Sequence, residues 1–134
     1  MSGQTITNSL LFTDDNKYAY FYSGDITTTS LTARLADFTT NSEYIYVKTL
    51  KMNITDQTVS SANYSFTVKF NGVTVLIEFY TNPNAGRQIA DSDNHYLIIP
   101  PFTNVTIDFL SSSGDKSSCV TLVGEVGMAP RVGN

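Results

Sequence analysis

One stretch in the middle of the chain constrains the fold more than any other. It reads Tyr64-Ser-Phe-Thr-Val-Lys-Phe70, then Asn71-Gly72, then Val73-Thr-Val-Leu-Ile-Glu-Phe79. Asn-Gly between two alternating apolar runs predicts a β-hairpin with a type I′ turn, because both turn residues must adopt a positive φ. Such a short loop also sets the register of the two strands. The expected pairs, all on one apolar face, are Phe70 with Val73, Val68 with Val75, Phe66 with Ile77 and Tyr64 with Phe79.

In this register Glu78 falls on the opposite, outward face, and Leu76 is the single residue that does not fit. The same alternation predicts further strands at 17–22, 26–35, 43–55, 95–99, 105–109 and 120–126. Leu31–Phe38 also fits a helix, although a strand followed by a turn explains it equally well. The sequence therefore predicts an all-β chain, a single antiparallel, jelly-roll-like β-sandwich of about eight strands.

Three stretches fall outside this pattern. We expect an N-terminal arm at residues 1–16, a sandwich domain at 17–126 and a C-terminal tail at 127–134. Inside the sandwich, residues 80–94 form the longest loop, and loops of this length are often functional. Its candidate contact residues are Asn84, Arg87, Asp91 and Asp93.

The composition excludes several classes of function. Charged residues make up 15% of the chain and the net charge is -4, with the basic residues scattered, so no nucleic-acid partner is expected. No run approaches the roughly 20 apolar residues that span a bilayer, so no membrane partner is expected. The single cysteine excludes an internal disulfide framework. With no basic, apolar signal segment at its start, the chain is expected to be made in a cytoplasm.

Candidate catalytic chemistry is sparse. The one histidine, His95, lacks a nucleophile elbow to serve and is expected at the start of a strand. Glu78 and Glu125 are the candidate pair for glycoside hydrolysis, which needs two facing carboxyl groups. Cys119 is expected to be a small buried residue. The Asp-rich stretches at 14–16 and 91–94 are expected to be turns and not calcium loops. The sequence thus predicts no catalytic residue, no metal site and no cofactor.

Tyrosines recur at a spacing of two in two of the predicted strands. These are Tyr18, Tyr20 and Tyr22 in one strand and Tyr44 and Tyr46 in another. Each group therefore points from one face of its strand. Three explanations remain open: ordinary packing, a protein interface, or an aromatic platform that stacks on sugars or bases.

The C-terminal part of the chain resembles a known class of proteins. Tyr96-Leu-Ile-Ile-Pro-Pro-Phe-Thr-Asn-Val-Thr-Ile-Asp-Phe109, followed by Cys119-Val-Thr-Leu-Val-Gly-Glu-Val126, looks like the closing strands of tailed-bacteriophage virion β-sandwich proteins, in particular the capsid decoration, or cement, class. The resemblance implies a role on the surface of a virion, a trimer or dimer, and terminal arms that grip neighbouring subunits. It carries over no functional residue.

Together these observations predict a non-enzymatic virion protein that binds the major capsid protein as a decoration subunit. The expected contacts with the capsid or with other subunits are Ile6, Leu10, Leu11 and Phe12 in the arm and Tyr18, Tyr20 and Tyr22 in the first strand. The alternatives are a carbohydrate-binding module, another virion component such as a tail, connector or fibre protein, and a small glycoside hydrolase.

Overall fold

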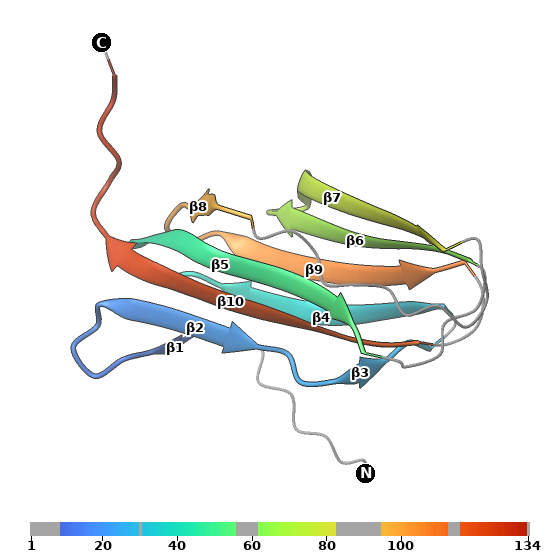
Figure 1. The fold of residues 1–134 in the computed structure, drawn as a ribbon. Coiled ribbons are helices and arrows are strands. Elements are labelled where there is room, and N and C mark those ends of the chain that lie inside the picture. The colour runs from blue at the N-terminus through green and yellow to red at the C-terminus, as the bar shows by residue number, and fades with distance from the viewer. Residues whose placement is uncertain (1–8, 30, 56–61, 83–94, 113–115, 134) are drawn as a thin grey trace.

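The chain forms two antiparallel β-sheets that pack face to face (Figure 1). The computed structural model describes residues 9–29, 31–55, 62–82, 95–112 and 116–133. Its strands are β1 (Leu11–Phe12), β2 (Tyr18–Tyr22), β3 (Ile26–Thr27), β4 (Thr32–Thr39), β5 (Tyr44–Ile54), β6 (Ala62–Phe70), β7 (Val73–Asn82), β8 (Leu97–Ile99), β9 (Asn104–Ser111) and β10 (Ser117–Gly127). The prediction of an all-β antiparallel sandwich is confirmed.

The order of the strands defines the type of sandwich. Sheet A has the order β1-β2-β10-β5-β8, with β3 also paired to β10, and sheet B has the order β4-β9-β6-β7. Without the short β1 and β3, each sheet contains four strands. The chain then changes sheet at every connection except the β6–β7 hairpin. Eight strands wound between two sheets in this way form a jelly roll. None of the described residues forms a helix that could cross a membrane.

The turn of the β6–β7 hairpin has the predicted geometry. Asn71 and Gly72 have φ angles of 51° and 82°, the positive values that a type I′ turn requires. The turn is also tied to β9, since the backbone N–H of Asn104 donates to the side-chain oxygen of Asn71 at 2.9 Å. The Asn71 side chain therefore links the hairpin to the neighbouring strand, a role that local sequence does not reveal.

Beyond the first pair, the predicted register of this hairpin is wrong. Phe70 pairs with Val73 as expected, but a β-bulge at Val75 shifts every later residue of β7 by one position. The observed pairs are Val68 with Leu76, Phe66 with Glu78 and Tyr64 with Tyr80. Because one extra residue reverses the alternation of a strand, Leu76, the residue that did not fit, lies on the inner face, and Ile77 and Phe79 lie on the outer face.

Bulges in two other strands also change which face of the sheet their side chains point to. In β5 the extra residue is Lys48, so Ile45 and Val47 before it and Leu50 after it all point into the core. Tyr44 and Tyr46 therefore face outward, whereas strict alternation along β5 would place them on the same face as Leu50. In β4 the register shifts at Leu35, between Arg34 and Ala36.

The strand predicted at 26–35 is two strands. Leu31 has a φ of 71°, which interrupts extended structure, and the backbone N–H groups of Thr29 and Thr32 each bond to the other residue's carbonyl. The chain passes here from β3 in sheet A to β4 in sheet B. The helix alternative for Leu31–Phe38 is wrong, because β4 covers most of that segment.

Side chains from both sheets fill the space between them. Phe21 of sheet A and Phe38 of sheet B have ring centroids 5.2 Å apart. In sheet B, Phe109 lies 4.8 Å from Phe66 and 6.1 Å from Tyr64. The largest fully buried side chains are Tyr64, Phe21, Phe66, Phe109, Leu35, Ile45, Leu50, Met52, Ile99, Ile107 and Leu122.

The close approach of β10 and β5 generates a prediction about stability. A Cβ atom on Gly124 would lie 2.7 Å from Cγ2 of Ile45 and 3.0 Å from the carbonyl oxygen of Tyr46. Gly124→Ala should lower the free energy of unfolding by about 1–3 kcal/mol, because overpacking moves backbone atoms. Urea unfolding measures this. Gly133→Ala, where nothing lies within 4 Å, is the control, and equal midpoints for the two variants would contradict the prediction.

Candidate functional site

The outer face of sheet A carries the tyrosines of β2. Tyr18, Tyr20 and Tyr22 are 47%, 44% and 47% exposed, whereas Ala19 and Phe21 between them are fully buried. The alternation of a strand explains this arrangement, since successive side chains point to opposite faces. The sequence prediction placed these three tyrosines on one face. Their exposure is an observation of the structure.

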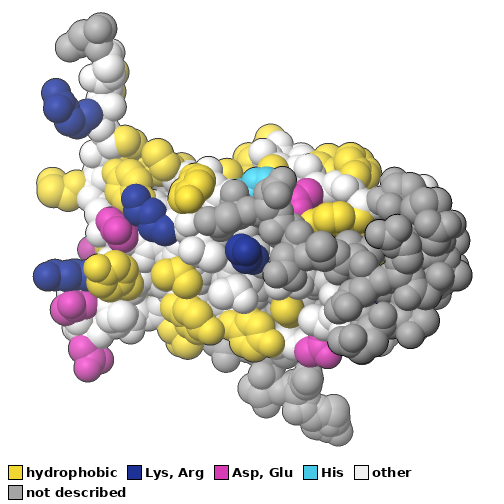
Figure 2. Space-filling view, viewed as in Figure 1, with side chains coloured by type: hydrophobic (Ala, Val, Ile, Leu, Met, Phe, Trp, Pro, Cys, Tyr) yellow, Lys and Arg dark blue, Asp and Glu magenta, His cyan; other side chains and the backbone are white. Residues whose placement is uncertain are grey.

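Neighbouring strands extend this surface across the sheet. Tyr20 pairs with Leu11 of β1 on one side and with Val123 of β10 on the other. Beyond β10 lie Tyr44 and Tyr46 of β5, which the bulge at Lys48 turns outward. We call this surface the tyrosine face. It consists of Leu11, Tyr18, Tyr20, Tyr22, Tyr44, Tyr46 and Val123. Figure 2 views it directly, and hydrophobic and tyrosine side chains gather there over β2, β10 and β5.

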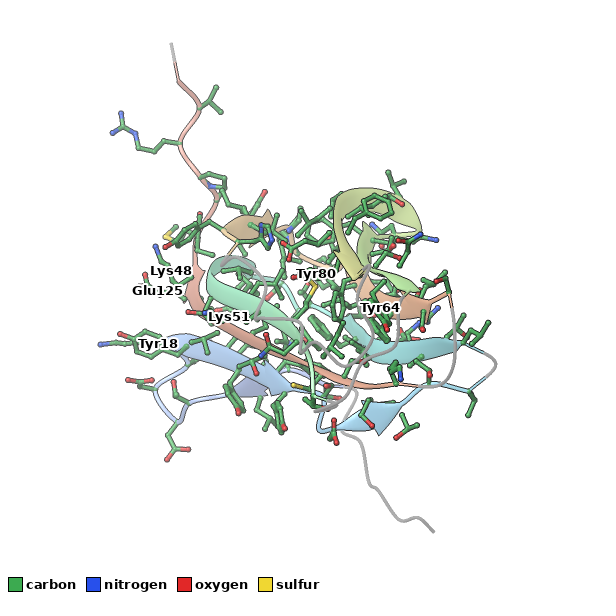
Figure 3. The ribbon with its side chains drawn as sticks, turned by 45° about the vertical axis from the view of Figure 1, so that its right-hand side comes forward. Tyr18, Lys48, Lys51, Tyr64, Tyr80 and Glu125 are labelled. Carbon is green, nitrogen blue, oxygen red and sulfur yellow. The ribbon has the colours of Figure 1, made fainter. Side chains whose placement is uncertain are left out.

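Few charges interrupt the tyrosine face. Glu125 lies beside Tyr18, and Lys51 lies in the same cross-strand row as Tyr22. Figure 3 shows Tyr18, Glu125, Lys48 and Lys51 on the outside of sheet A. The pKa of Tyr22 is raised, first by partial burial and then by the nearby Cys119, Asp25 and Tyr20. The phenolic hydroxyl of Tyr22 can donate a hydrogen bond to a partner at this face.

Tyr46 joins the tyrosine face to the C-terminal tail. Its hydroxyl donates to the backbone carbonyl of Met128, and its ring lies 6.4 Å from that of Tyr44, at an interplanar angle of 27°. A Cβ atom on Gly127 would meet the Tyr46 ring at 2.7 Å, so glycine allows the ring to cover the backbone here. Beyond Met128 the tail runs away from the sandwich (Figure 1).

The residues of the predicted N-terminal arm lie in different settings. Leu10 is 8% exposed and belongs to the core of this chain. Leu11 and Phe12 form β1, which pairs with Tyr20 and Ala19 of β2. Leu11 is more than half exposed and Phe12 is half-buried. Ile6 lies outside the described residues, so the division into arm, sandwich and tail stays a prediction.

The candidate contact residues of the long loop also lie outside the described residues. These are Asn84, Arg87, Asp91 and Asp93, and the predicted turn at 91–94 belongs with them. The structure places the two ends of this loop in different sheets, since it follows β7 of sheet B and precedes β8 of sheet A.

Glu78 and His95 contact each other, which the sequence prediction missed. Glu78 was expected on an outward face, and this is wrong because the bulge in β7 turns it inward. Its carboxylate bonds Nε2 of His95 and accepts a hydrogen bond from the Tyr80 hydroxyl. The side chains of His95 and Glu78 are 24% and 15% exposed. The cluster thus connects β7 of sheet B to the residue that leads into β8 of sheet A.

The predicted carboxylate pair is not brought together. Glu78 points from sheet B toward the inside of the sandwich, whereas Glu125 is exposed on the outer face of sheet A. Two carboxyl groups on opposite sides of sheet A cannot flank one glycosidic bond, so Glu78 and Glu125 cannot serve as the catalytic pair of a glycoside hydrolase.

Two other candidates for chemistry lie in the described part of the chain. Cys119 is buried in β10, as expected of a small packed residue. Asp15 accepts a hydrogen bond from the Thr13 hydroxyl at 2.6 Å and one from the Lys17 backbone N–H at 3.2 Å, and these bonds lower its pKa. Thr13, Asp15 and Asn16 thus form a turn before β2. Among the described residues no three His, Cys, Asp or Glu side chains gather closely enough to hold a metal ion.

Comparisons with known proteins give structural similarities only. No protein-family model and no curated protein matches the chain. Among solved structures, it resembles the VP2 subviral particle of infectious bursal disease virus, with a TM-score of 0.42 and 14% identity over 84% of this chain and 37% of that one. It also resembles a mutant VP2 protein of the same virus in T=1 particles, with a TM-score of 0.40 and 13% identity over 96% of this chain and 41% of that one. The chain thus spans less than half of either VP2 chain, and similarities this low transfer no role to it.

The Glu78–His95 contact generates a prediction. His95→Ala removes one of the hydrogen bonds described for a half-buried carboxylate, which should lower the free energy of unfolding by about 1–3 kcal/mol. Chemical denaturation measures the loss. Glu125→Gln, on the exposed outer face, should change stability by less than about 0.5 kcal/mol. If the two variants unfold at the same urea concentration, the contact contributes nothing to stability.

Proposed function

We propose that this chain is a non-enzymatic structural protein of a virion, and that it decorates the capsid by binding the major capsid protein through its tyrosine face. The observation that carries the proposal is the row of half-exposed tyrosines on β2, extended by Leu11 and Val123. Tyrosine is enriched at protein interfaces because it offers a large contact area at a low entropic cost.

The fold and the resemblance of the closing strands support the same proposal. Jelly rolls occur in viral capsid and lectin domains, although a fold alone does not define a function. The closing strands resemble those of tailed-phage decoration proteins. On a repetitive shell, many weak contacts add up, so a modest interface on each subunit suffices. The proposed location is the capsid surface, reached after synthesis in the host cytoplasm, with no cofactor required.

The predicted arm adds a second contact to this proposal. Ile6 and Leu11 remain candidates for binding a neighbouring subunit, since Leu11 is exposed. Leu10 and Phe12 would act by holding β1 in place, because Leu10 is buried in the core of the same chain and Phe12 packs against it.

Replacing a central tyrosine tests the proposed face. Tyr20→Ala should weaken binding to purified capsids of the virus that encodes this chain by about tenfold or more, the usual loss at an interfacial aromatic residue. Sedimentation of the protein with the capsids measures it. Phe102→Ala removes another exposed aromatic ring, from the β8–β9 connection, and should leave binding unchanged. Equal binding by the two variants would contradict the proposal.

Removing residues 2–8 tests the arm separately. This deletion spares Leu10 and β1, so the sandwich should keep the circular dichroism spectrum and melting temperature of the full chain. Binding to the same capsids should be lost. If the shortened protein still saturates the capsid sites, the arm is not a contact.

Carbohydrate binding is the second candidate, and one observation favours it. A hollow of about 500 Å³ lies beside Tyr44, lined also by Asn16, Glu43 and Met128. An aromatic ring next to a carboxylate and an amide can stack on a sugar and bond its hydroxyl groups. A glycan array distinguishes the two candidates: binding that Tyr44→Ala abolishes and Tyr20→Ala spares would favour the sugar.

A further inference from the structure

Within the described residues, the outer strands are β1, β3 and β8 in sheet A and β4 and β7 in sheet B, and all except β7 are poor partners for another sheet. An unpaired edge invites another strand, and proteins block it with short strands, prolines, bulges or charges. In sheet A, β1 and β3 have two residues each, while β8 has three and is followed by Pro100 and Pro101. In sheet B, β4 carries a bulge, and its Arg34 bonds Asp108 and Asp37. The Asp108 bond is the main reason that the pKa of Arg34 is raised.

The remaining outer strand, β7, lacks most of these protections. It is ten residues long, and within the described residues no strand pairs with the side of β7 that faces away from β6. It contains no lysine, arginine or proline. Its bulge lies near the hairpin turn, so the pairing from Leu76 onward is regular.

From its bulge to Phe79, β7 presents apolar side chains on its outward face. Val75, Ile77 and Phe79 are 42%, 45% and 73% exposed, whereas Val73 precedes the bulge and lies opposite Phe70, on the inner side. We call Val75, Ile77 and Phe79 the β7 stripe. It continues onto β9, because Ser65 pairs with both Phe79 and the exposed Leu110. Phe79, Ser65 and Leu110 border a shallow hollow of about 220 Å³.

The single charge of β7 is kept off this surface. Glu78 points inward and its carboxylate is bonded to His95 and Tyr80. A copy of the strand that approaches the open edge therefore meets no charge on the outward face. Glu78 therefore adds no local repulsion at this edge to the general repulsion between chains that each carry a net charge of -4.

We propose that the open edge of β7 binds a second copy of this chain, with the two β7 strands antiparallel about a twofold axis. Sheet B of each copy would then continue into sheet B of the other. In such a pair each β7 strand lies against an identical strand that runs in the opposite direction, and the residues of the β7 stripe suit this arrangement. With Ile77 opposite Ile77 of the second copy, Val75 lies opposite Phe79 and Leu76 opposite Glu78, so apolar residues meet on the outward face.

The position of Glu78 also selects among registers. A shift that centred the pair on Glu78 would place two carboxylates directly opposite each other, which is unfavourable. The register centred on Ile77 avoids this. This inference is independent of the proposed function, because it uses the edge of sheet B and leaves the tyrosine face of sheet A free.

The oligomeric state of the purified chain tests the proposal. Light scattering on a size-exclusion column should give a mass of about twice the 14.7 kDa of one chain. Ile77→Lys should raise the dimer dissociation constant at least about a hundredfold, since it places two like charges opposite each other. Thr67→Lys is the matched control, because Thr67 is the partner of Ile77 on the inner strand β6 and should leave the dimer intact. A monomeric wild-type chain, or an Ile77→Lys variant that dimerises like the wild type, would overturn the proposal.

A cysteine pair tests the register. Ile77→Cys should form a disulfide-linked dimer under mild oxidation, because the two residues face each other across the axis. Thr67→Cys should remain uncrosslinked. Crosslinking of both variants to the same extent, or of neither, would show that the register or the edge is wrong. Cys119 can stay in both variants because it is buried.

Discussion

The structure depends above all on the pairing of β10 with its neighbours. β10 is bonded along one side to β5, from Ser118 to Gly127, and along the other side to β2 and β3. It therefore joins the beginning and the middle of the chain in one sheet. Its inward residues Val120 and Leu122 belong to the core, while Val123 lies among the tyrosines of the outer face. Without this strand, neither the closed sandwich nor the tyrosine face would exist.

Much of the fold follows from local sequence, and the errors have one physical cause. The Asn71-Gly72 turn was predictable because few residue pairs accept positive φ at both positions. Alternation located most of the strands as well. It could not locate the bulges at Leu35, Lys48 and Val75, since a bulge is fixed by how two strands fit together and not by the residues of one strand. Each bulge then reversed the face of every later residue in its strand.

In the candidate site, too, local alternation predicts some features and the fit between strands decides others. The three tyrosines of β2 could be placed on one face because that strand contains no bulge. Their exposure could not be predicted, since alternation does not say which face is buried. Glu78 was assigned to the wrong face because its position depends on the bulge at Val75. Its contact with His95 joins two sheets across a long loop, and no short-range pattern carries that information.

The place of β10 in the chain affects when the protein can fold. The strands of sheet B lie between residues 32 and 111, so the ribosome has delivered all of them before β10 is complete. Sheet A, in contrast, lacks its central strand until residues 117–127 emerge. Until β10 emerges from the ribosome, β2 and β5 lack the strand that joins them, and apolar surface exposed during synthesis favours aggregation. Mutations in β10 are therefore expected to lower soluble yield more than mutations of equally buried residues in β9.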